Sequence, residues 1–499
     1  MDGFVDYPSL NDRWSELEFS GVDFGDNRLN RRLFSLARVL AEYPLNPINQ
    51  ACGDPHQAKA AYRFFGNEKV TSEVILASHQ RQTCQRIEGK SLVFLVQDTS
   101  FIDFTSHLKT KGLGKIGRYL HGENNGKGLV MHTTLALDEE GLPLGILDQQ
   151  IWARAVKPDP SRYGELYRTP IEKKESFKWL RGLHESLSHV WQNMEDQPSL
   201  VLIADREADI FELWEEVLDQ WGHFIIRAQK ERVIIKPGSK IRNRSGTAFY
   251  TLWDELKKAP VAGHLTVEVA KRPSTTNSVG TPTRKAKLSI RFCPIKVALP
   301  RRTSIRHRTA KESRRQTHDR ARDLNAIWVK EKSPPAGVEA LEWMLVTDMS
   351  VSDLSDAEGI IGYYKLRWRV ELFHKILKSG CRVEDCRLGT AERLKKYLTL
   401  SSIIAWRILW MSILNRQQPE SSCDCILTED EWKALACRIN KTNTPPKSPP
   451  TVRQVMRWIA KLGGFLGRQG DGEPGMVTIW RGWQRLSDIT EDWKIFRPP

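Results

Sequence analysis

Four side chains in the segment YYKLRWRVELFHKILK (residues 363–378) have the types and spacing to act together on a polyanion. Intervals of 3, 4 and 7 residues separate Tyr364, Arg367, Glu371 and Lys378. On one continuous helix they fall within about 60° of one another, because each residue advances by about 100°. Such a stripe suits a site that binds a metal beside a phosphate chain and stacks on flat rings. The alternative is an ordinary solvated face, with Glu371 and Lys375 as an i,i+4 pair.

Two apolar segments upstream each close on an aspartate. SLVFLVQD ends at Asp98, and the apolar run of SLVLIADREAD ends at Asp205. These runs are typical of central strands covered on both faces, and α/β folds place their sites at the carboxyl ends of such strands. Asp205 could instead cap a following helix. Together with Glu371, the two aspartates could hold two divalent metals, about 3.5–4 Å apart, for in-line phosphoryl transfer.

On these motifs the sequence resembles bacterial insertion-sequence transposases of the DDE type, in the insertion-sequence-four family with its transposon-five-like members. The family signature Y-(2)-R-(3)-E-(6)-K matches the four residues above. Its QDT and DREAD segments match residues 97–99 and 205–209, and a strand tryptophan matches Trp343 in LEWMLVTD. The resemblance extends to GDNRLNRRL near the amino end and to LGGFLGRQGDGEPG near the carboxyl end, so it covers nearly the whole chain.

The resemblance implies a role for each of these residues. Asp98, Asp205 and Glu371 would be the catalytic acids and would hold two Mg²⁺ ions, with Mn²⁺ as a substitute. Trp343 would stack on a base that leaves the duplex during hairpin formation. The adjacent phosphates would be held by Tyr364, Arg367 and Lys378.

Second-rank DNA contacts follow from position near these residues. They are Arg227, Lys375 and Trp368, of which Trp368 could equally be a core residue.

Composition agrees with a DNA-binding protein. The 499 residues carry a formal net charge of +15 and a pI of about 9.4, which favours a polyanionic partner. The amino end has no apolar signal segment, and the longest apolar stretch, Leu400–Met411, is interrupted by Arg407 and too short to span a bilayer. We therefore expect a cytoplasmic protein with no membrane partner, associated with the nucleoid when bound to DNA. The eight cysteines lack paired CxxC spacing and are expected to be reduced bystanders.

Residues 1–85 are predicted to be helical. Helix starts are expected at Asp26 or Asn27, at Asp54-Pro55 and at Thr71 or Ser72. Arginines lie opposite the leucine face of the first helix, which by itself could be a solvated face. The resemblance places a domain specific for transposon ends here, with Arg28 and Arg32 as DNA contacts.

Residues 86–380 are predicted to form a mixed α/β core. The expected order is three strands, including a hairpin of Gly128–Leu137 and Leu144–Arg154, then α-β-α-β and a late helix with Glu371. The resemblance implies that this core is ribonuclease-H-like. Alternating segments in 229–337 predict an antiparallel β insertion. Between Arg301 and Arg322 it carries nine Arg or Lys and two acids, either a solvated arm or a phosphate contact.

Residues 381–499 are predicted to be helical, with TPPKSPP (444–450) as a stiff linker. Thr451 should cap a helix that ends at Gly463-Gly464, before a last helix with Trp480 and Trp483. The resemblance implies that this region pairs two transposases. The apolar faces of these helices suit either such an interface or packing on the core.

These features together predict a Mg²⁺-dependent cut-and-paste DNA transposase. Its partners would be the transposon ends, the target DNA and, in the DNA complex, a second copy of the chain. Three alternatives remain open: another two-metal nuclease of the same fold, a non-catalytic DNA-binding descendant, and a hydrolase that uses paired carboxylates without metal.

Overall fold

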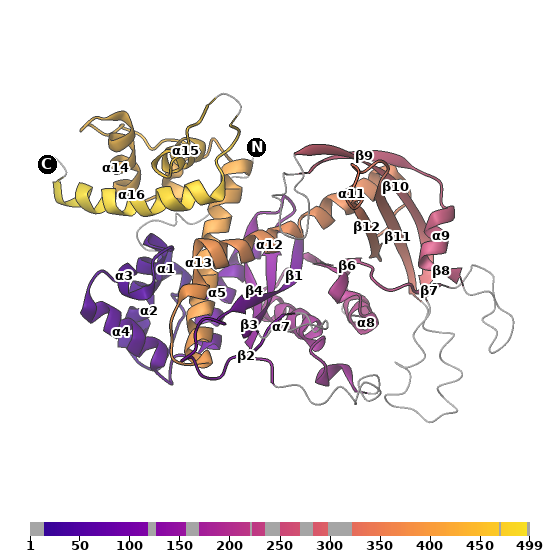
Figure 1. Ribbon diagram of the computed structural model, residues 1–499, viewed down its shortest axis with the longest axis horizontal. Coiled ribbons are helices and arrows are strands. Elements are labelled where there is room, and N and C mark those ends of the chain that lie inside the picture. The colour runs from indigo at the N-terminus through magenta and orange to yellow at the C-terminus, as the bar shows by residue number, and fades with distance from the viewer. Residues whose placement is uncertain are drawn as a thin grey trace.

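The computed structural model describes residues 14–117, 126–155, 169–219, 222–234, 250–269, 283–297, 322–468 and 471–496. One mixed sheet runs through the molecule, with helical regions from both chain ends gathered at one side of it (Figure 1). The mixed α/β class predicted from the sequence is therefore confirmed, as are the helical ends. Of the basic run between Arg301 and Arg322, only Arg322 lies within the described residues.

The amino-terminal helices begin where the sequence predicts. Asp26, Asp54 and Thr71 each accept a hydrogen bond from a backbone amide of the first turn, the standard way to satisfy an orphan amide. The helices are α1 (Trp14–Glu18), α2 (Asn27–Glu42), α3 (Ile48–Ala51), α4 (Pro55–Gly66) and α5 (Ser72–Ile87).

The sheet has twelve strands in the order β2-β3-β1-β5-β6-β12-β11-β10-β7-β8, with β4 beside β3 and β9 beside β10. Strands β1, β5 and β6 pair in parallel, and all other pairs are antiparallel. The first six strands are β1 (Leu92–Asp103), β2 (Gly114–Lys115), β3 (Lys127–Leu137), β4 (Pro143–Trp152), β5 (Ser199–Ala204) and β6 (His223–Arg227). The others are β7 (Val233–Ile234), β8 (Tyr250–Thr251), β9 (Gly263–Val269), β10 (Arg284–Val297), β11 (Arg322–Glu331) and β12 (Glu342–Thr347).

The expected order of core elements is observed. The hairpin β3–β4 is followed by α7 (Phe177–Asn193), β5, α8 (Phe211–Asp219) and β6. Residues 229–337 contribute β7, β8, α9 (Leu252–Lys258), β9, β10 and β11. Strand β12 lies between β6 and β11, so the strands of this segment belong to the same sheet as the core.

The two faces of the sheet bury two different cores. Phe94 and Val96 of β1 point to the side covered by α11 (Leu354–Lys365), α12 (Trp368–Lys375) and α13 (Ala391–Gln417). Val93 and Leu95 point to the other side, which α7 and α8 cover. Because side chains alternate along a strand, this division fixes the face on which each polar residue of β1 lies.

Helix α13 is longer than the apolar stretch that the sequence suggests. It has 27 residues and, among the described helices, it alone is long and apolar enough to cross a membrane. Yet 94% of its most apolar window is buried inside the molecule. It packs against β4, α5 and the amino-terminal helices, so here it serves as the central core helix. Arg407, which interrupts the apolar run, lies over the ring of Trp14 at 4.8 Å.

The carboxyl-terminal helices are α14 (Glu429–Asn440), α15 (Val452–Leu462) and α16 (Met476–Phe496). Thr451 caps α15 as predicted, and Gly463 follows the last turn of that helix. The apolar side chains of α15 are buried within the chain itself, as are Trp480 and Trp483 of α16. Packing inside one chain therefore accounts for much of the amphipathic pattern of these two helices.

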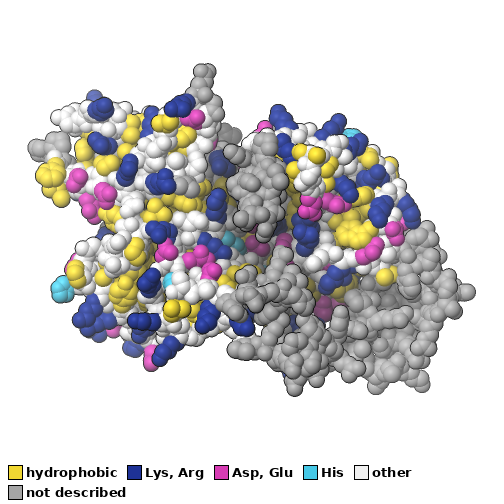
Figure 2. Space-filling model, in the orientation of Figure 1, with side chains coloured by type: hydrophobic (Ala, Val, Ile, Leu, Met, Phe, Trp, Pro, Cys, Tyr) yellow, Lys and Arg dark blue, Asp and Glu magenta, His cyan; other side chains and the backbone are white. Residues whose placement is uncertain are grey.

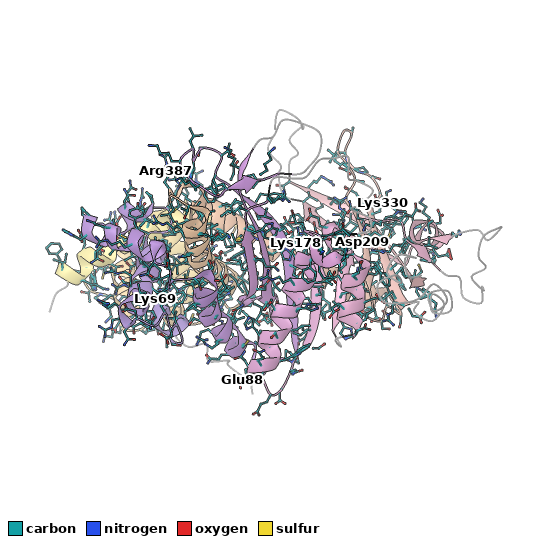
Figure 3. All side chains as sticks on the ribbon, turned by 90° about the horizontal axis from the view of Figure 1, so that it is seen from below. Lys69, Glu88, Lys178, Asp209, Lys330 and Arg387 are labelled. Carbon is teal, nitrogen blue, oxygen red and sulfur yellow. The ribbon has the colours of Figure 1, made fainter. Side chains whose placement is uncertain are left out.

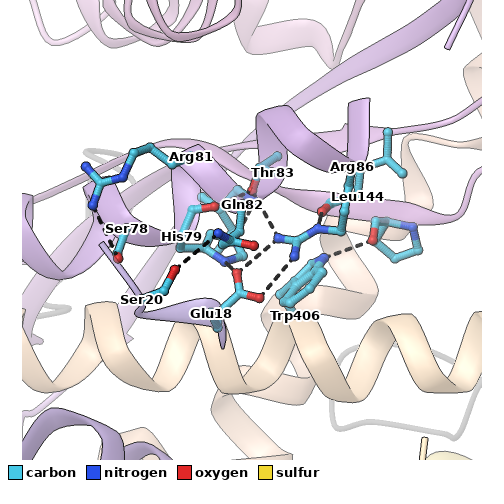
Figure 4. A network of polar contacts seen from close by, with 12 residues as sticks. Glu18, Ser20, Ser78, His79, Arg81, Gln82, Thr83, Arg86, Leu144 and Trp406 are labelled. Atoms are coloured by element: carbon cyan, nitrogen blue, oxygen red, sulfur yellow. Dashed lines mark hydrogen bonds and ion pairs between the residues drawn. The ribbon is translucent and has the colours of Figure 1, made fainter. Parts of the chain in front are cut away.

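A buried polar network joins the amino-terminal helices to the sheet (Figure 4). His79 Nδ1 lies 2.5 Å from Glu18 Oε1, and Arg86 donates to both oxygens of Glu18 at 3.0 Å. His79 Nε2 accepts from the amide of Ile146 at 2.8 Å, where the β3–β4 pairing is irregular. The ring of Trp406 lies 4.2 Å from the Arg86 guanidinium. Elements α1, α5, β4 and α13 thus meet around one carboxylate.

Candidate active site

Asp98 and Asp205 lie side by side because of the register between β1 and β5. Val96 pairs with Ile203 in the parallel ladder, and each aspartate follows two residues later. Both therefore point to the face that carries Phe94 and Val96. The prediction that Asp98 ends its strand is wrong. Strand β1 pairs with β5 only as far as Val96, but it pairs with β3 as far as Asp103.

Asp205 directly follows β5 and caps a short 3₁₀ helix, Arg206–Ala208. Its Oδ1 accepts from the amide of Glu207 at 2.8 Å. The alternative that Asp205 is a capping residue is therefore confirmed, and it is compatible with a place in the site. Burial raises the pKa of the Asp205 carboxyl, the Glu207 amide opposes that rise, and the nearby charge of Asp98 adds to it.

Glu371 lies on α12, but the single helix predicted for 363–378 does not form. Helix α11 ends at Lys365, α12 begins at Trp368, and residues Ile376–Gly380 form a π-helical turn. At the junction the amides of Leu366 and Arg367 bond to carbonyls three residues back, which tightens the backbone. The stripe that the sequence predicts is therefore interrupted, and Lys378 falls in the π-helical turn.

The carboxylate of Glu371 is paired with Arg367. Arg367 Nη2 donates to Glu371 Oε1, and the arginine side chain is only 10% exposed. The guanidinium lies 5.9 Å from the Tyr364 ring and 5.1 Å from the Trp368 ring. Helix α12 packs on β1, so the element that carries Glu371 adjoins the strand that carries Asp98. Among the described residues, no three His, Cys, Asp or Glu side chains are arranged to hold a metal ion.

An aromatic and basic group lies beside the three acids. The half-buried Trp343 ring is 6.2 Å from that of Tyr364. Arg227 of β6 donates to the carbonyl of Glu342 at 2.6 Å, and burial lowers its pKa. Tyr364 is 3% exposed and burial raises its pKa, so this residue does not belong to the solvated face that was the alternative.

The remaining predicted contacts of this segment lie nearer the surface. Trp368 is 53% exposed, which excludes the alternative that it is a core residue. Lys375 is exposed and Lys378 is half-buried.

Two histidines at this site carried little or no signal in the sequence. His374 lies one turn after Glu371, and its Nδ1 is 3.5 Å from Asp98 Oδ2. His132 of β3 lies between Gln97 and Thr99, with contacts of 3.2 and 2.9 Å on its two ring nitrogens. The QDT segment thus places its aspartate on one face of β1 and anchors its neighbours on the other. The i,i+3 spacing from Glu371 could have indicated His374, whereas nothing in the sequence of β3, KGLVMHTTLAL, distinguishes His132.

The last aspartate of DREAD has a structural role. Asp209 is buried and accepts from the amides of Gln229 and Lys230 and from Arg232, which fixes the chain leaving β6. Lys178 of α7 reaches Glu207 at 3.4 Å. Figure 3 shows Lys178 and Asp209 in the middle of the molecule, with Lys330 further out.

The arginines predicted to contact DNA in α2 are at the surface. Arg28 pairs with Asp26 at 3.1 Å, and Arg32 donates to Gln57 of α4 at 2.5 Å. Lys and Arg side chains gather over these helices at the lower left of Figure 2.

All eight cysteines are free thiols. Burial raises the pKa of Cys381 and Cys386 to about 12, so both are protonated at neutral pH, a form in which a thiol is a poor metal ligand.

Comparison with protein families finds three successive matches along the chain. Residues 11–70 match a family described as Transposase DNA-binding. Residues 180–407 match Transposase DDE domain, and residues 403–497 match Transposase Tn5 dimerisation domain. Asp205 and Glu371 fall within the second match, whereas Asp98 lies between the first and second.

Proposed function

The chain is a DNA transposase of the Tn5 type, and we propose that it moves an insertion sequence by cut-and-paste with Asp98, Asp205 and Glu371 as its catalytic acids. Its DNA-binding, DDE and dimerisation domains follow in that order. The observation that carries the assignment of acids is the β1–β5 register, which brings Asp98 beside Asp205 on the face where α12 packs.

The donor types of the three acids fit a divalent metal, which a DDE domain implies, although no three acids of the described residues are already grouped around a metal-sized site. Carboxylate oxygens are the ligands that Mg²⁺ prefers. Burial and the neighbouring Asp98 both disfavour the charged form of Asp205, and a bound cation would favour that form. We propose that the three acids hold two Mg²⁺ ions, with Mn²⁺ as a substitute. The ions would activate water or a 3′-hydroxyl and stabilise the leaving oxygen.

The other side chains would hold and shape the DNA. Arg367, Tyr364 and Lys378 would bind phosphates next to the reacting bond, with Arg227, Lys375 and Trp368 at the margin of the site. Arg367 pairs with Glu371 in the chain alone, so a phosphate at this guanidinium would loosen its hold on that carboxylate. Trp343 would stack on a base extruded during hairpin formation. Nicking, hairpin formation, hairpin opening and strand transfer can share one site, because each is an in-line phosphoryl transfer.

We also propose a function for each part of the chain. Residues 1–85 would recognise the transposon ends, with Arg28 and Arg32 on the DNA. Residues 86–380 would be a ribonuclease-H-like core with an antiparallel insertion at about 229–337 that contacts phosphate. Residues 381–499 would pair two chains on two ends, and the complex would then capture target DNA in the cytoplasm.

Cleavage of a short duplex that contains one transposon end tests the acids. Asp98→Asn, Asp205→Asn and Glu371→Gln should each abolish nicking in Mg²⁺ while binding to the duplex persists. Glu207→Gln is the matched control, because this acid lies two residues from Asp205 and its side chain is half exposed. Full nicking by any of the three variants would remove that acid from the site. Ends that are cut by the wild type but never joined to target DNA would favour a nuclease instead.

A further inference from the structure

His374 connects the helix that carries one proposed acid to the strand that carries another. It lies on α12 one turn beyond Glu371, and its Nδ1 is 3.5 Å from Asp98 Oδ2. The residue is 6% exposed although it adjoins a site that must admit DNA. A buried imidazole in this place constrains the position of the Asp98 carboxylate.

The two nitrogens of this ring have different surroundings. Nδ1 faces the carboxylate of Asp98, so it is the ring nitrogen placed to donate to that acid. Nε2 is buried and has no hydrogen-bond partner among the described residues. Among those residues, the polar contact of this ring is therefore with a proposed catalytic acid.

The surroundings of His374 leave little freedom for the ring. The Phe373 ring lies 5.4 Å away at 54°. His132 lies close enough for the charge of His374 to affect its titration, and His132 is itself held by Thr99 on the opposite face of β1. The buried ring of His374 thus lies between helix α12 and strand β1, next to Asp98.

We propose that His374 is a positioning residue that orients the carboxylate of Asp98 for metal binding, an inference that rests on the proposed catalytic role of Asp98. A proton on Nδ1 would hold Oδ2 and would leave Oδ1 free to bind the metal. The 3.5 Å contact exceeds a normal hydrogen bond, as contacts in ligand-free sites often do. Supporting groups of this kind typically alter metal affinity or activity by about 10–100-fold.

Three substitutions separate positioning from simple packing. Asparagine can place an amide N–H close to the position of Nδ1, whereas glutamine reaches instead to the position of Nε2. Leucine fills the volume and donates nothing. We therefore expect His374→Asn to retain most function, with His374→Gln and His374→Leu both impaired. A packing role predicts no such preference for asparagine over glutamine.

The experiment measures Mn²⁺ binding and Mg²⁺-dependent nicking with the full-length protein on an end duplex. Paramagnetic resonance of free Mn²⁺ gives the metal affinity directly. The expected result for His374→Gln and His374→Leu is half-saturation at about 10-fold or more higher metal, with duplex binding unchanged. His374→Asn should stay within about threefold of the wild type, and nicking of the impaired variants should recover partly at high Mg²⁺.

The possible results distinguish a positioning role of His374 from a packing role. Wild-type metal affinity in His374→Leu, or equal behaviour of His374→Gln and His374→Asn, would overturn the positioning role. Thermal melting of the metal-free proteins identifies any variant that fails to fold, and the comparison of asparagine with glutamine then decides. If the wild type itself neither binds Mn²⁺ nor nicks the duplex, the proposed function fails rather than this inference.

Discussion

Two carboxylate sites in this molecule have opposite electrostatics. Glu18 is buried and surrounded by donors: burial would raise its pKa, but Arg86 and His79 outweigh that effect and lower it to about 2. Asp205 is half-buried, and burial and the nearby Asp98 raise its pKa. The first carboxylate is satisfied by the protein itself. The second lies beside another carboxylate, and a bound cation would relieve it. The contrast distinguishes an acid that joins parts of the fold from one that we propose to be a metal ligand.

The largest expected effect is the loss of catalysis in Asp205→Asn without loss of stability. Metal-borne stabilisation of the transition state is worth several kcal/mol, so nicking should fall about a thousandfold or more. Asparagine keeps the cap on the Glu207 amide and removes a disfavoured charge, so the urea midpoint should stay the same or rise. Cleavage gels and urea unfolding check both parts. A marked fall in stability would mean that Asp205 is a structural acid like Glu18.

Glu18→Gln should show the reverse behaviour. Removal of one partner from a buried ion pair typically costs about 3–5 kcal/mol of stability, and Arg86 here would lose its bidentate carboxylate. Nicking per folded molecule should remain within about twofold at low temperature, because Glu18 contacts His79 and Arg86 and none of the three acids. Urea unfolding followed by tryptophan fluorescence gives the stability change. A variant as stable as the wild type would contradict the structural role of this carboxylate.

Trp343→Ala should have a smaller and more selective effect. Stacking of a base on an aromatic ring is worth about 1–3 kcal/mol, so hairpin yield should fall by about fivefold to a hundredfold while the first nick is unaffected. A denaturing gel separates nicked ends from hairpins. Unchanged hairpin yield would remove Trp343 from the site and leave its contact with Tyr364 as packing only.

The smallest expected effect is a difference in acid sensitivity. Burial lowers the pKa of His79, so its contribution to stability is present above the unfolded value of about 6.5 and declines as the pH falls below it. Protonation of Glu18 also destabilises the folded protein, and its contribution to stability is lost as the pH falls from about 4.5 to about 2. Melting temperatures between pH 7.5 and 5 should therefore fall less in His79→Gln than in the wild type. Parallel slopes in the two proteins would show that His79 is not titrating as a buried neutral ring.

The comparison also shows what local sequence could and could not reveal. The caps at Asp26, Asp54, Thr71 and Thr451 were predictable because each depends on a hydrogen bond to an amide within three residues. The two apolar runs correctly indicated central strands, whereas the adjacency of β1 and β5 and the register that brings Asp98 beside Asp205 are seen only in the structure.

The predictions from the sequence were wrong where contacts between residues far apart in the chain determine the structure. Nothing in the sequence around Leu366 and Arg367 requires a break, yet α11 ends there with Tyr364 turned inward against Trp343. Asp98 lies within its strand because β3 extends the pairing beyond β5. The Glu18–His79 contact joins residues 61 positions apart, and the partners of His132 lie 33 and 35 positions away in the sequence. None of these leaves a local pattern.

Mn²⁺ binding to the full-length protein tests the central claim most directly, namely that Asp98, Asp205 and Glu371 are the metal ligands. Titration followed by paramagnetic resonance, with an end duplex present, compares the wild type with Asp205→Asn and Glu18→Gln under conditions where all three are folded. We expect Asp205→Asn to lose Mn²⁺ binding and Glu18→Gln to keep the wild-type affinity for Mn²⁺. Undiminished Mn²⁺ binding by Asp205→Asn would contradict the claim.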